Sequence, residues 1–263
     1  MEPIDEAQAV EANLVEFFRH FARARKGGEV TELEEVSIAS CGIEFYMFNA
    51  AFFSSPVAPA GKELERRIDT AARHFASRDC RWAFWAAESK LEACTSHQVR
   101  NAFRGQSLHP AFRHPGMVCD ALAPPRSLPD LEFRQVAGRP SRLDFSHINA
   151  VAFHLPFHWC SELYDVDALW NRDFIGYLGC VDGEPVCTAA TLVASGAVGL
   201  YSVATLPGHE RKGYGEAITR HAVERARASS GLTRLILQAT DAGLALYRRL
   251  GYRTVTHFGI YST

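Results

Sequence analysis

The sequence of 263 residues lacks an excess of either charge, because 28 Lys and Arg residues stand against 30 Asp and Glu residues. Nucleic-acid binding takes most of its affinity from neutralised phosphates, so this balance argues against a nucleic-acid partner. The chain also lacks the polar, low-complexity composition of disordered proteins, since 47% of its residues are hydrophobic. It therefore has enough apolar material for one large domain or two small ones.

The seven cysteines include no CxxC pair and no Cys/His pair with zinc-like spacing. Their odd number favours reduced, packed thiols, which predicts a cytoplasmic protein without a metal site. Cys160 and Cys187 are expected to be buried thiols rather than nucleophiles, because no histidine–acid pair is recognisable around them.

No basic segment followed by an apolar core, as in a signal peptide, begins the sequence. The longest uncharged stretch, Pro185–Pro207, contains Thr, Ser and Gly residues, and Ser195-Gly196 is typical of a turn. Two buried strands explain this stretch better than a membrane helix, so no membrane association is expected.

Hydrophobic spacing predicts an α/β first half. Val10, Leu14, Phe17, Phe18 and Phe21 share one face of a helix that Gly27-Gly28 ends. Residues 31–53 are expected to hold two strands broken near Gly42, followed by a helix from Leu64 to Phe75, a strand at 81–88, a helix to about Arg104 and a strand at 117–122.

The proline-rich segment 121–130 is the clearest linker, because proline lacks an amide donor and forces the residue before it to be extended. We therefore predict domains at 1–124 and 130–263. In the second domain the expected order is β-α-α-β-β-β-α-β-α-β, with a two-residue turn at Asp182-Gly183. This order gives a mixed α+β fold, a mostly antiparallel meander with one parallel pair.

The segment Leu200–Arg220, LYSVATLPGHERKGYGEAITR, is typical of an anion-binding turn. A strand leads into a loop with Arg211 and Lys212, and Gly213-Tyr214-Gly215 opens a helix whose first amides lack intrahelical partners. It is not a P-loop, since G-x-x-x-x-G-K-[ST] is absent, and Ile218 stands where a Rossmann loop needs a third glycine. A glycine that merely turns the chain is the alternative.

A second motif lies in Thr240–Tyr252, TDAGLALYRRLGY, where a tyrosine on a short helix precedes Leu-Gly-aromatic and a strand. With both motifs present, the sequence from about residue 131 to 263 resembles the GNAT superfamily of acetyl-CoA-dependent N-acetyltransferases. The family's loop, Q/R-x-x-G-x-G/A, aligns with Glu210–Gly215. The first position is therefore glutamate here, a departure from the family, and Arg211 beside it is expected to supply the positive charge.

This resemblance implies roles for individual residues. Strand 201–205 would separate from its neighbour and pair with the pantetheine arm of acetyl-CoA, and the amides from Arg211 to Glu216 would hold the pyrophosphate. Tyr247 matches the family's general acid, although a core aromatic is the alternative. The cofactor-binding residues implied are Val203, Ala204, Thr205, Glu210, Arg211, Lys212, Gly213, Tyr214, Gly215, Glu216 and Thr240, the last with a helix N-cap as its alternative role.

The chemistry implied is direct acetyl transfer to a primary amine of a small molecule or peptide, which requires removal of a proton from the amine. Glu162 is the expected catalytic residue on the acceptor side, and His154, His158 and Tyr201 are further candidates for the base or the acceptor pocket. Because of Glu210, a non-catalytic acyl-CoA-binding regulatory module stays open, as does a structural protein. Neither the acceptor nor the oligomeric state can be predicted.

The first half has no G-x-G loop between Met1 and Pro125. Its tail, with a strand at 81–88, a helix, Phe103-Arg104-Gly105 and a strand, is similar to Arg234–Gly251. We therefore expect a degenerate second copy of the fold that has lost cofactor binding. An unrelated helical cap over the acceptor site is the alternative.

Overall fold

The computed structural model describes residues 5–58, 61–125 and 127–263, and the chain divides into two compact units. Unit 1 consists of residues up to Glu11, Phe18–Gly116 and Thr254–Thr263; unit 2 consists of Ala12–Phe17 and Met117–Arg253. The predicted domains treat each half as one continuous stretch. Both units, in contrast, take in a short segment from the opposite end of the sequence.

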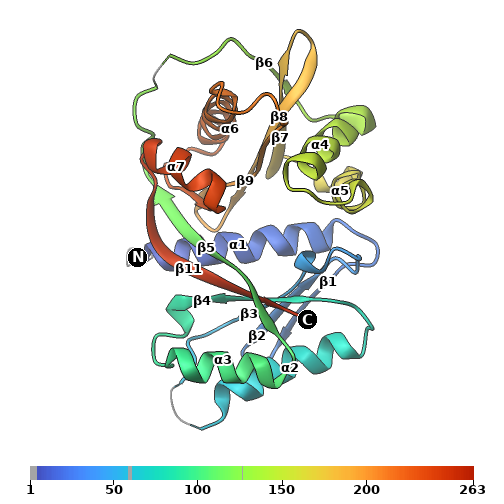
Figure 1. Cartoon of the computed structure of the whole chain (residues 1–263), viewed down its shortest axis with the longest axis vertical. Helices are drawn as coiled ribbons and strands as arrows, with labels where there is room; N and C mark the ends of the chain where they lie inside the picture. The colour runs from blue at the N-terminus through green and yellow to red at the C-terminus, as the bar shows by residue number, and fades with distance from the viewer. Residues whose placement is uncertain (1–4, 59–60, 126) are drawn as a thin grey trace. The chain divides into compact units, whose positions relative to one another are not determined.

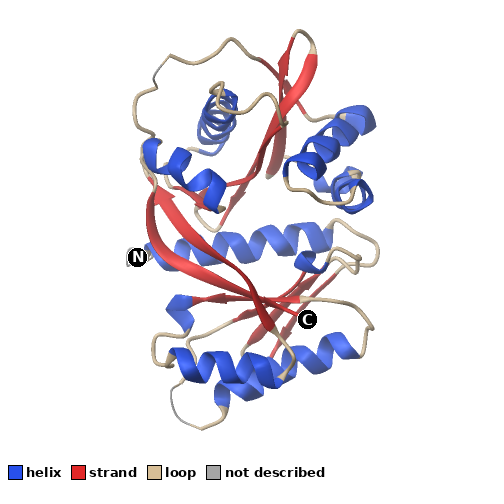
Figure 2. Ribbon diagram, viewed as in Figure 1, coloured by secondary structure: helices blue, strands red, loops and turns tan. Residues whose placement is uncertain are grey.

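Unit 1 is a sheet with helices on both faces (Figures 1 and 2). Its strand order is β1-β2-β3-β4-β11-β5, antiparallel from β1 to β3, parallel between β3 and β4, and antiparallel between β4 and β11. Its elements are α1 (Glu6–Arg23), β1 (Glu29–Leu33), β2 (Val36–Ser40), β3 (Asn49–Phe53), α2 (Glu63–Ala76), β4 (Ala83–Ala87), α3 (Ser96–Gly105), β5 (His109–Cys119) and β11 (Arg253–Ser262), with short 3₁₀ turns at Tyr46–Phe48 and Glu88–Lys90.

Two predictions for this half were wrong in detail. Three strands, not two, occupy the region around 31–53, because the chain also turns at Glu35, whose φ is +61°. Strand β5 begins at His109, eight residues before the predicted start, in a stretch that is exposed and so lacks the apolar pattern of a strand.

Strands of unit 1 contain continuous hydrophobic runs because successive side chains point to opposite faces of the sheet and both faces are buried. Both faces of the sheet are covered at β2, β3 and β4, so successive residues of these strands are all buried. Phe52 and Trp85 contact Phe18 of α1, with ring centroids 5.4 and 5.0 Å away. The neighbouring Phe53 and Phe84 point to the other face, where they join the core under α2 and α3.

Unit 2 has the strand order β5-β10-β9-β8-β7-β6, in which β6 to β9 form an antiparallel meander and β10 is parallel to β9. Helix α6 packs on one face of this meander and α4 on the other (Figure 1). The elements are β6 (Glu132–Gln135), α4 (Gly138–Ala152), α5 (Phe157–Tyr164), β7 (Phe174–Val181), β8 (Glu184–Ala194), β9 (Ala197–Thr205), α6 (Tyr214–Ser230), β10 (Leu235–Gln238) and α7 (Asp241–Arg249), with a 3₁₀ turn at Asp167–Leu169.

The mixed α/β fold predicted for this half is confirmed. The turn between β7 and β8 lies at Asp182-Gly183, and both residues have positive φ, as its sequence indicated. The uncharged stretch 185–207 forms strands β8 and β9. Within the described ranges, no helix combines the length and the apolar character that crossing a membrane requires.

The two units repeat one order of elements. In unit 1 three antiparallel strands are followed by α2, the parallel strand β4 and α3; in unit 2 they are followed by α6, the parallel strand β10 and α7. The strands after the last helices are exchanged, since β11 pairs with β4 while Met117–Cys119 of β5 belongs to unit 2, where β5 neighbours β10. The repeat excludes an unrelated helical cap for the first half.

Candidate functional site

Strand β9 is bent in the middle by a β-bulge. Three residues of β9, from Tyr201 to Ala204, advance while β8 advances by only two, and Ser202 in the bulge has a φ of +51°. The hydroxyl of Thr188 on β8 donates a hydrogen bond of 2.8 Å to the Ser202 carbonyl oxygen. A bulge of this kind redirects a strand and increases its twist.

Beyond the bulge, β9 leaves its parallel neighbour. The ladder to β10 covers Val198 and Gly199, and no later residue of β9 has a partner on β10 in the described chain. Backbone groups of 201–205 on this side therefore have no strand partner among the described residues of β10, and this is the segment whose Val203 and Thr205 amides are expected to contact the cofactor. Val203 and Thr205 are half-buried, and Ala204 between them is buried.

The loop after β9 turns three times through left-handed conformations, at Gly208, Arg211 and Gly213. Gly213, with φ +86°, is the N-cap of α6, and the first helical bond runs from the Ala217 amide to the Gly213 carbonyl at 3.0 Å. The amides of Tyr214, Gly215 and Glu216 therefore precede that first bond. Such amides and the positive end of the helix dipole suit a phosphate group.

The two cationic side chains of this loop, Arg211 and Lys212, are available to bind an anion. Arg211 and Lys212 are exposed, and neither forms an ion pair with a residue in the described ranges. The acidic side chain in the first turn of α6, Glu216, is held by Arg220 one turn later at 2.9 Å, which neutralises it. Glu210 is exposed, at the position where the family has a glutamine or arginine.

Tyr247 projects from α7 into the core of unit 2 and is 8% exposed. Burial raises its pKa well above the usual value, so the phenol stays protonated at physiological pH. Its hydroxyl differs from that of Tyr252, which is completely buried and has no hydrogen-bond partner in the described structure. The Tyr247 hydroxyl is not among the completely buried polar atoms that lack a partner in the described residues.

Three of the predicted segments come together. A Cβ added at Gly215, at the start of α6, would lie 3.7 Å from Thr205 Oγ1 on β9 and 3.6 Å from Leu246 Cδ2 on α7. Thr240 is exposed at the start of α7, and its hydroxyl accepts a hydrogen bond from the Gly243 amide at 3.3 Å. It is thus the helix cap that was its alternative role. Glu162 is exposed on α5.

Of the other acceptor-side candidates, Tyr201 contacts residues of α1. It is buried, stacks on Phe17 with 3.9 Å between ring centroids, and donates its hydroxyl hydrogen to Asn13 Oδ1 at 2.7 Å. Burial also raises its pKa well above normal. These contacts make it part of the core rather than a base.

Sequence reasoning missed a polar network beside the bulge. The hydroxyls of Tyr164 on α5 and Ser202 are 2.9 Å apart, and buried Asn149 on α4 donates to Thr188 Oγ1 at 3.2 Å. Asn149 Oδ1 is buried with no partner in the described residues. The only signal was the placement of polar residues in otherwise apolar elements, which does not show that they meet.

The fold and this geometry agree with a family match. Residues 133–252 match the acetyltransferase (GNAT) family. They cover the meander, the glycine-rich loop, α6 and α7, so the C-terminal half of the chain is a GNAT acetyltransferase domain. Membership of this family supports acyl transfer as the general activity. No curated protein matched the chain.

Solved structures share the fold over the whole chain. A GCN5-related N-acetyltransferase from Kribbella flavida has a TM-score of 0.72 at 20% identity, covering 100% of this chain and 96% of its own. A conserved protein of unknown function from Staphylococcus epidermidis has a TM-score of 0.67 at 15% identity, covering 90% and 94%. A tandem GNAT protein from the clavulanic acid biosynthesis pathway has a TM-score of 0.52 at 8% identity, covering 81% and 74%. The two-unit layout is therefore that of a tandem GNAT fold.

Proposed function

We propose that the protein is an acetyl-CoA-dependent N-acetyltransferase that transfers the acetyl group directly to a primary amine of a small molecule or peptide. The observation that carries this proposal is the convergence, in one unit, of the unpaired end of β9, the glycine-rich start of α6 and α7, the helix that carries Tyr247. The free thiols of the seven cysteines support a cytoplasmic location.

The residues present fit acetyl-CoA. Amides from Arg211 to Glu216, with the side chains of Arg211 and Lys212, would hold the diphosphate, and the β9 backbone at Val203 and Thr205 would pair with the pantetheine arm. His209, inside the loop, has a buried Nδ1 with no partner among the described residues, which suits a polar ligand. Acetyl-CoA supplies the acetyl group as a reactive thioester.

Side chains and amides of the protein would then transfer the protons and stabilise the charges of the reaction. An amine attacks only when neutral, and an alkylamine with a pKa near ~10 is mostly protonated at physiological pH, so a proton must leave first. We assign that step to Glu162, directly or through water. An amide of Val203 or Thr205 would stabilise negative charge on the carbonyl oxygen, and Tyr247 would protonate the departing sulfur.

The test is release of free CoA thiol when the purified protein is incubated with acetyl-CoA and a library of amines. Tyr247→Phe should lower kcat at least tenfold and leave CoA binding intact. Tyr252→Phe is the matched control, because it removes a phenol hydroxyl five residues away that is sealed in the core. Binding of CoA without turnover for any amine would support a non-catalytic acyl-CoA-binding module instead. If CoA gives no thermal stabilisation at all, both functions are excluded; ligand at a hundred times its Kd should add about 2.7 kcal/mol.

A further inference from the structure

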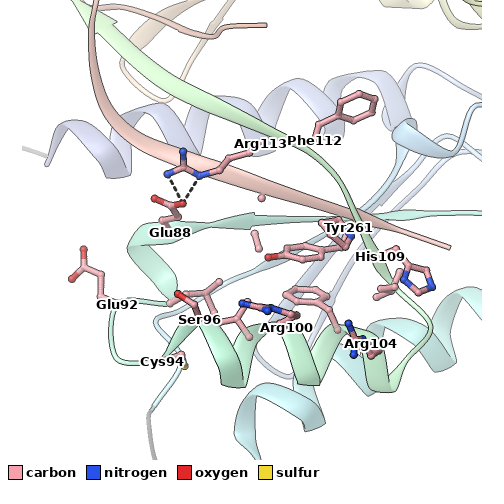
Figure 3. Close-up of a pocket in the computed structure, with 17 residues that line it drawn as sticks. Glu88, Glu92, Cys94, Ser96, Arg100, Arg104, His109, Phe112, Arg113 and Tyr261 are labelled. Atoms are coloured by element: carbon pink, nitrogen blue, oxygen red, sulfur yellow. Dashed lines mark hydrogen bonds and ion pairs between the residues drawn. The ribbon is translucent and has the colours of Figure 1, made fainter. Parts of the chain in front are cut away.

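Unit 1 contains a cavity of about 590 Å³ that the proposed acetyl transfer does not use. It lies beside α3 and the first residues of β5, with Ala86 of β4 and Gly259 and Tyr261 of β11 in its lining (Figure 3). Its size is within the range of sites that bind small organic molecules.

The lining of the cavity includes a stacked pair of aromatic rings. The rings of Phe103 and Tyr261, which both line it, are stacked with centroids 3.7 Å apart and planes 2° from parallel. Apolar side chains of Leu91, Val99 and Leu108 complete the lining on the α3 side. Gly259 adds no side chain, and the ring of Tyr261 lies over it, since a Cβ added at Gly259 would be 3.0 Å from that ring.

The rim of the cavity carries more positive than negative charge. Three arginines and two glutamates line it, and Arg113 is paired with Glu88 at 2.9 Å. Arg100 and Arg104, on one face of α3, are exposed and have no ion pair or hydrogen bond to any residue of the described ranges. Only Glu92 opposes them, which leaves an excess of one positive charge.

Arg100 also lies close enough to Tyr261 for its charge to affect the phenol. Burial raises the pKa of Tyr261, the charge of Glu88 raises it further, and the charge of Arg100 lowers it. Figure 3 shows Arg100 and Arg104 on the same helix, below Tyr261 in this view. Arg100 and Tyr261 thus line the same cavity.

We propose that this cavity binds a small organic carboxylate with a flat apolar body, the body against Tyr261 and the apolar lining beside α3, and the carboxylate held by Arg100 and Arg104. Guanidinium groups bind carboxylates through two parallel hydrogen bonds, which makes arginine the suited residue. The site lies wholly in unit 1, and the inference does not depend on acetyl transfer.

The experiment is a titration of the full-length protein with 2-naphthoate at low salt, followed by ligand fluorescence. Saturable binding is expected, and the neutral isostere 2-naphthamide should bind at least tenfold more weakly. The double variant Arg100→Ala/Arg104→Ala should weaken naphthoate binding at least tenfold, with an unchanged melting temperature because both side chains are exposed. Arg73→Ala is the matched control, since it removes an exposed arginine from α2 of the same unit.

Three results would each overturn the proposal: no saturable binding, equal affinity for the acid and the amide, or unchanged affinity in the double variant. Neither probe contains an amine or CoA. The titration therefore gives its answer whether or not the protein acetylates amines.

Discussion

Tyr247 and Tyr252 lie in edge-to-face contact in the core of unit 2, with ring centroids 5.9 Å apart. The pKa of each is raised by burial, and of the two hydroxyls only that of Tyr252 is completely buried without a hydrogen-bond partner among the described residues. The sequence indicated Tyr247 through its position before Leu-Gly-aromatic. It could not show which of the two hydroxyls is buried without a partner, since that depends on packing.

Burial also changes the chemistry of two thiols, Cys187 and Cys160. Cys187 is completely buried on β8, and burial raises its pKa from 9.0 to about 12; for Cys160 burial raises the pKa to about 11. Because the thiolate is the reactive form, neither thiol is a nucleophile at neutral pH. This agrees with the prediction from the absence of a neighbouring histidine–acid pair.

The raised pKa of Cys187 makes stability depend on pH. The unfolded thiol ionises above pH 9 while the folded one stays neutral, so its contribution is complete below pH 9 and is lost between pH 9 and 12. Between pH 7 and 10 the free energy of unfolding should fall by about 1.4 kcal/mol more in the wild type than in Cys187→Ala. Urea unfolding at both pH values measures this difference; parallel pH profiles would show that the folded thiol ionises normally.

At the scale of elements, the loop before α6 was predicted well because its determinants are local. Gly213 adopts φ +86°, which few other residues tolerate, and α6 begins immediately after it. The β9 bulge was not predicted, because it depends on a hydrogen bond from Thr188, a residue of another strand. Local glycine patterns specify turns, whereas a bulge requires the register of two strands.

Substitution of Gly213 tests whether the loop before α6 binds CoA, and substitution of Gly231 at the other end of the helix is the control. Gly231 caps the other end of the same helix with φ +72°, so Ala at either position should cost about 1–2 kcal/mol of stability. Only Gly213→Ala should raise the Kd for CoA, by about tenfold, because the added methyl group lies 3.0 Å from Pro129 Cδ and moves the loop amides. Calorimetric titration of both variants measures this, and equal Kd values would show that the loop does not bind CoA.

At the scale of the whole molecule, the two units resemble one another in element order but differ where a cofactor would bind. After β3, the Val57 amide donates a 2.8 Å hydrogen bond to the carbonyl of Lys90, which follows β4. Buried Arg67 donates hydrogen bonds to the carbonyls of Ser55 and Pro56 in the same segment. In unit 1 the segments that follow β3 and β4 are therefore hydrogen-bonded to each other. In unit 2 the corresponding strands, β9 and β10, separate. This difference supports the expected loss of cofactor binding in unit 1.

Unit 2 in turn depends on a short segment near the start of the chain. Asn13, completely buried in α1, donates to the carbonyls of Ala194 and Ala197 at 2.8 and 3.2 Å and accepts from Tyr201. The first two bonds hold the turn of the β8–β9 hairpin, and the third reaches Tyr201, one residue before Ser202 of the bulge. A helix that sequence assigned to the first domain therefore supports the strand expected to bind the cofactor.

Asn13→Ala should lower the free energy of unfolding by about 2–3 kcal/mol, because it removes two hydrogen bonds and leaves the buried Tyr201 hydroxyl unpaired. Tyr201→Phe in the same background should recover part of this loss, since the orphaned hydroxyl is then absent. A double-mutant cycle by urea unfolding measures the coupling. Additive effects of the two substitutions would show that the bond contributes nothing.

The sequence by itself determined the features that arise from neighbours along the chain. Helical spacing predicted α1 and α2, Asp182-Gly183 predicted a hairpin, and Gly213-Tyr214-Gly215 predicted the start of a helix with free amides. Each depends on backbone preferences or on the burial of one face, which a window of a few residues encodes.

Only the tertiary structure decided which segments complete each unit. The exchange of β5 and β11, the place of Asn13 against a hairpin 181 residues away, and the pairing of Ser202 with Tyr164 all join distant parts of the chain. The stability of such contacts comes from filling space and satisfying buried polar groups, and many partners could satisfy either requirement. The pattern of a single sequence shows that a residue is to be buried, but the packing of the whole chain selects its partner.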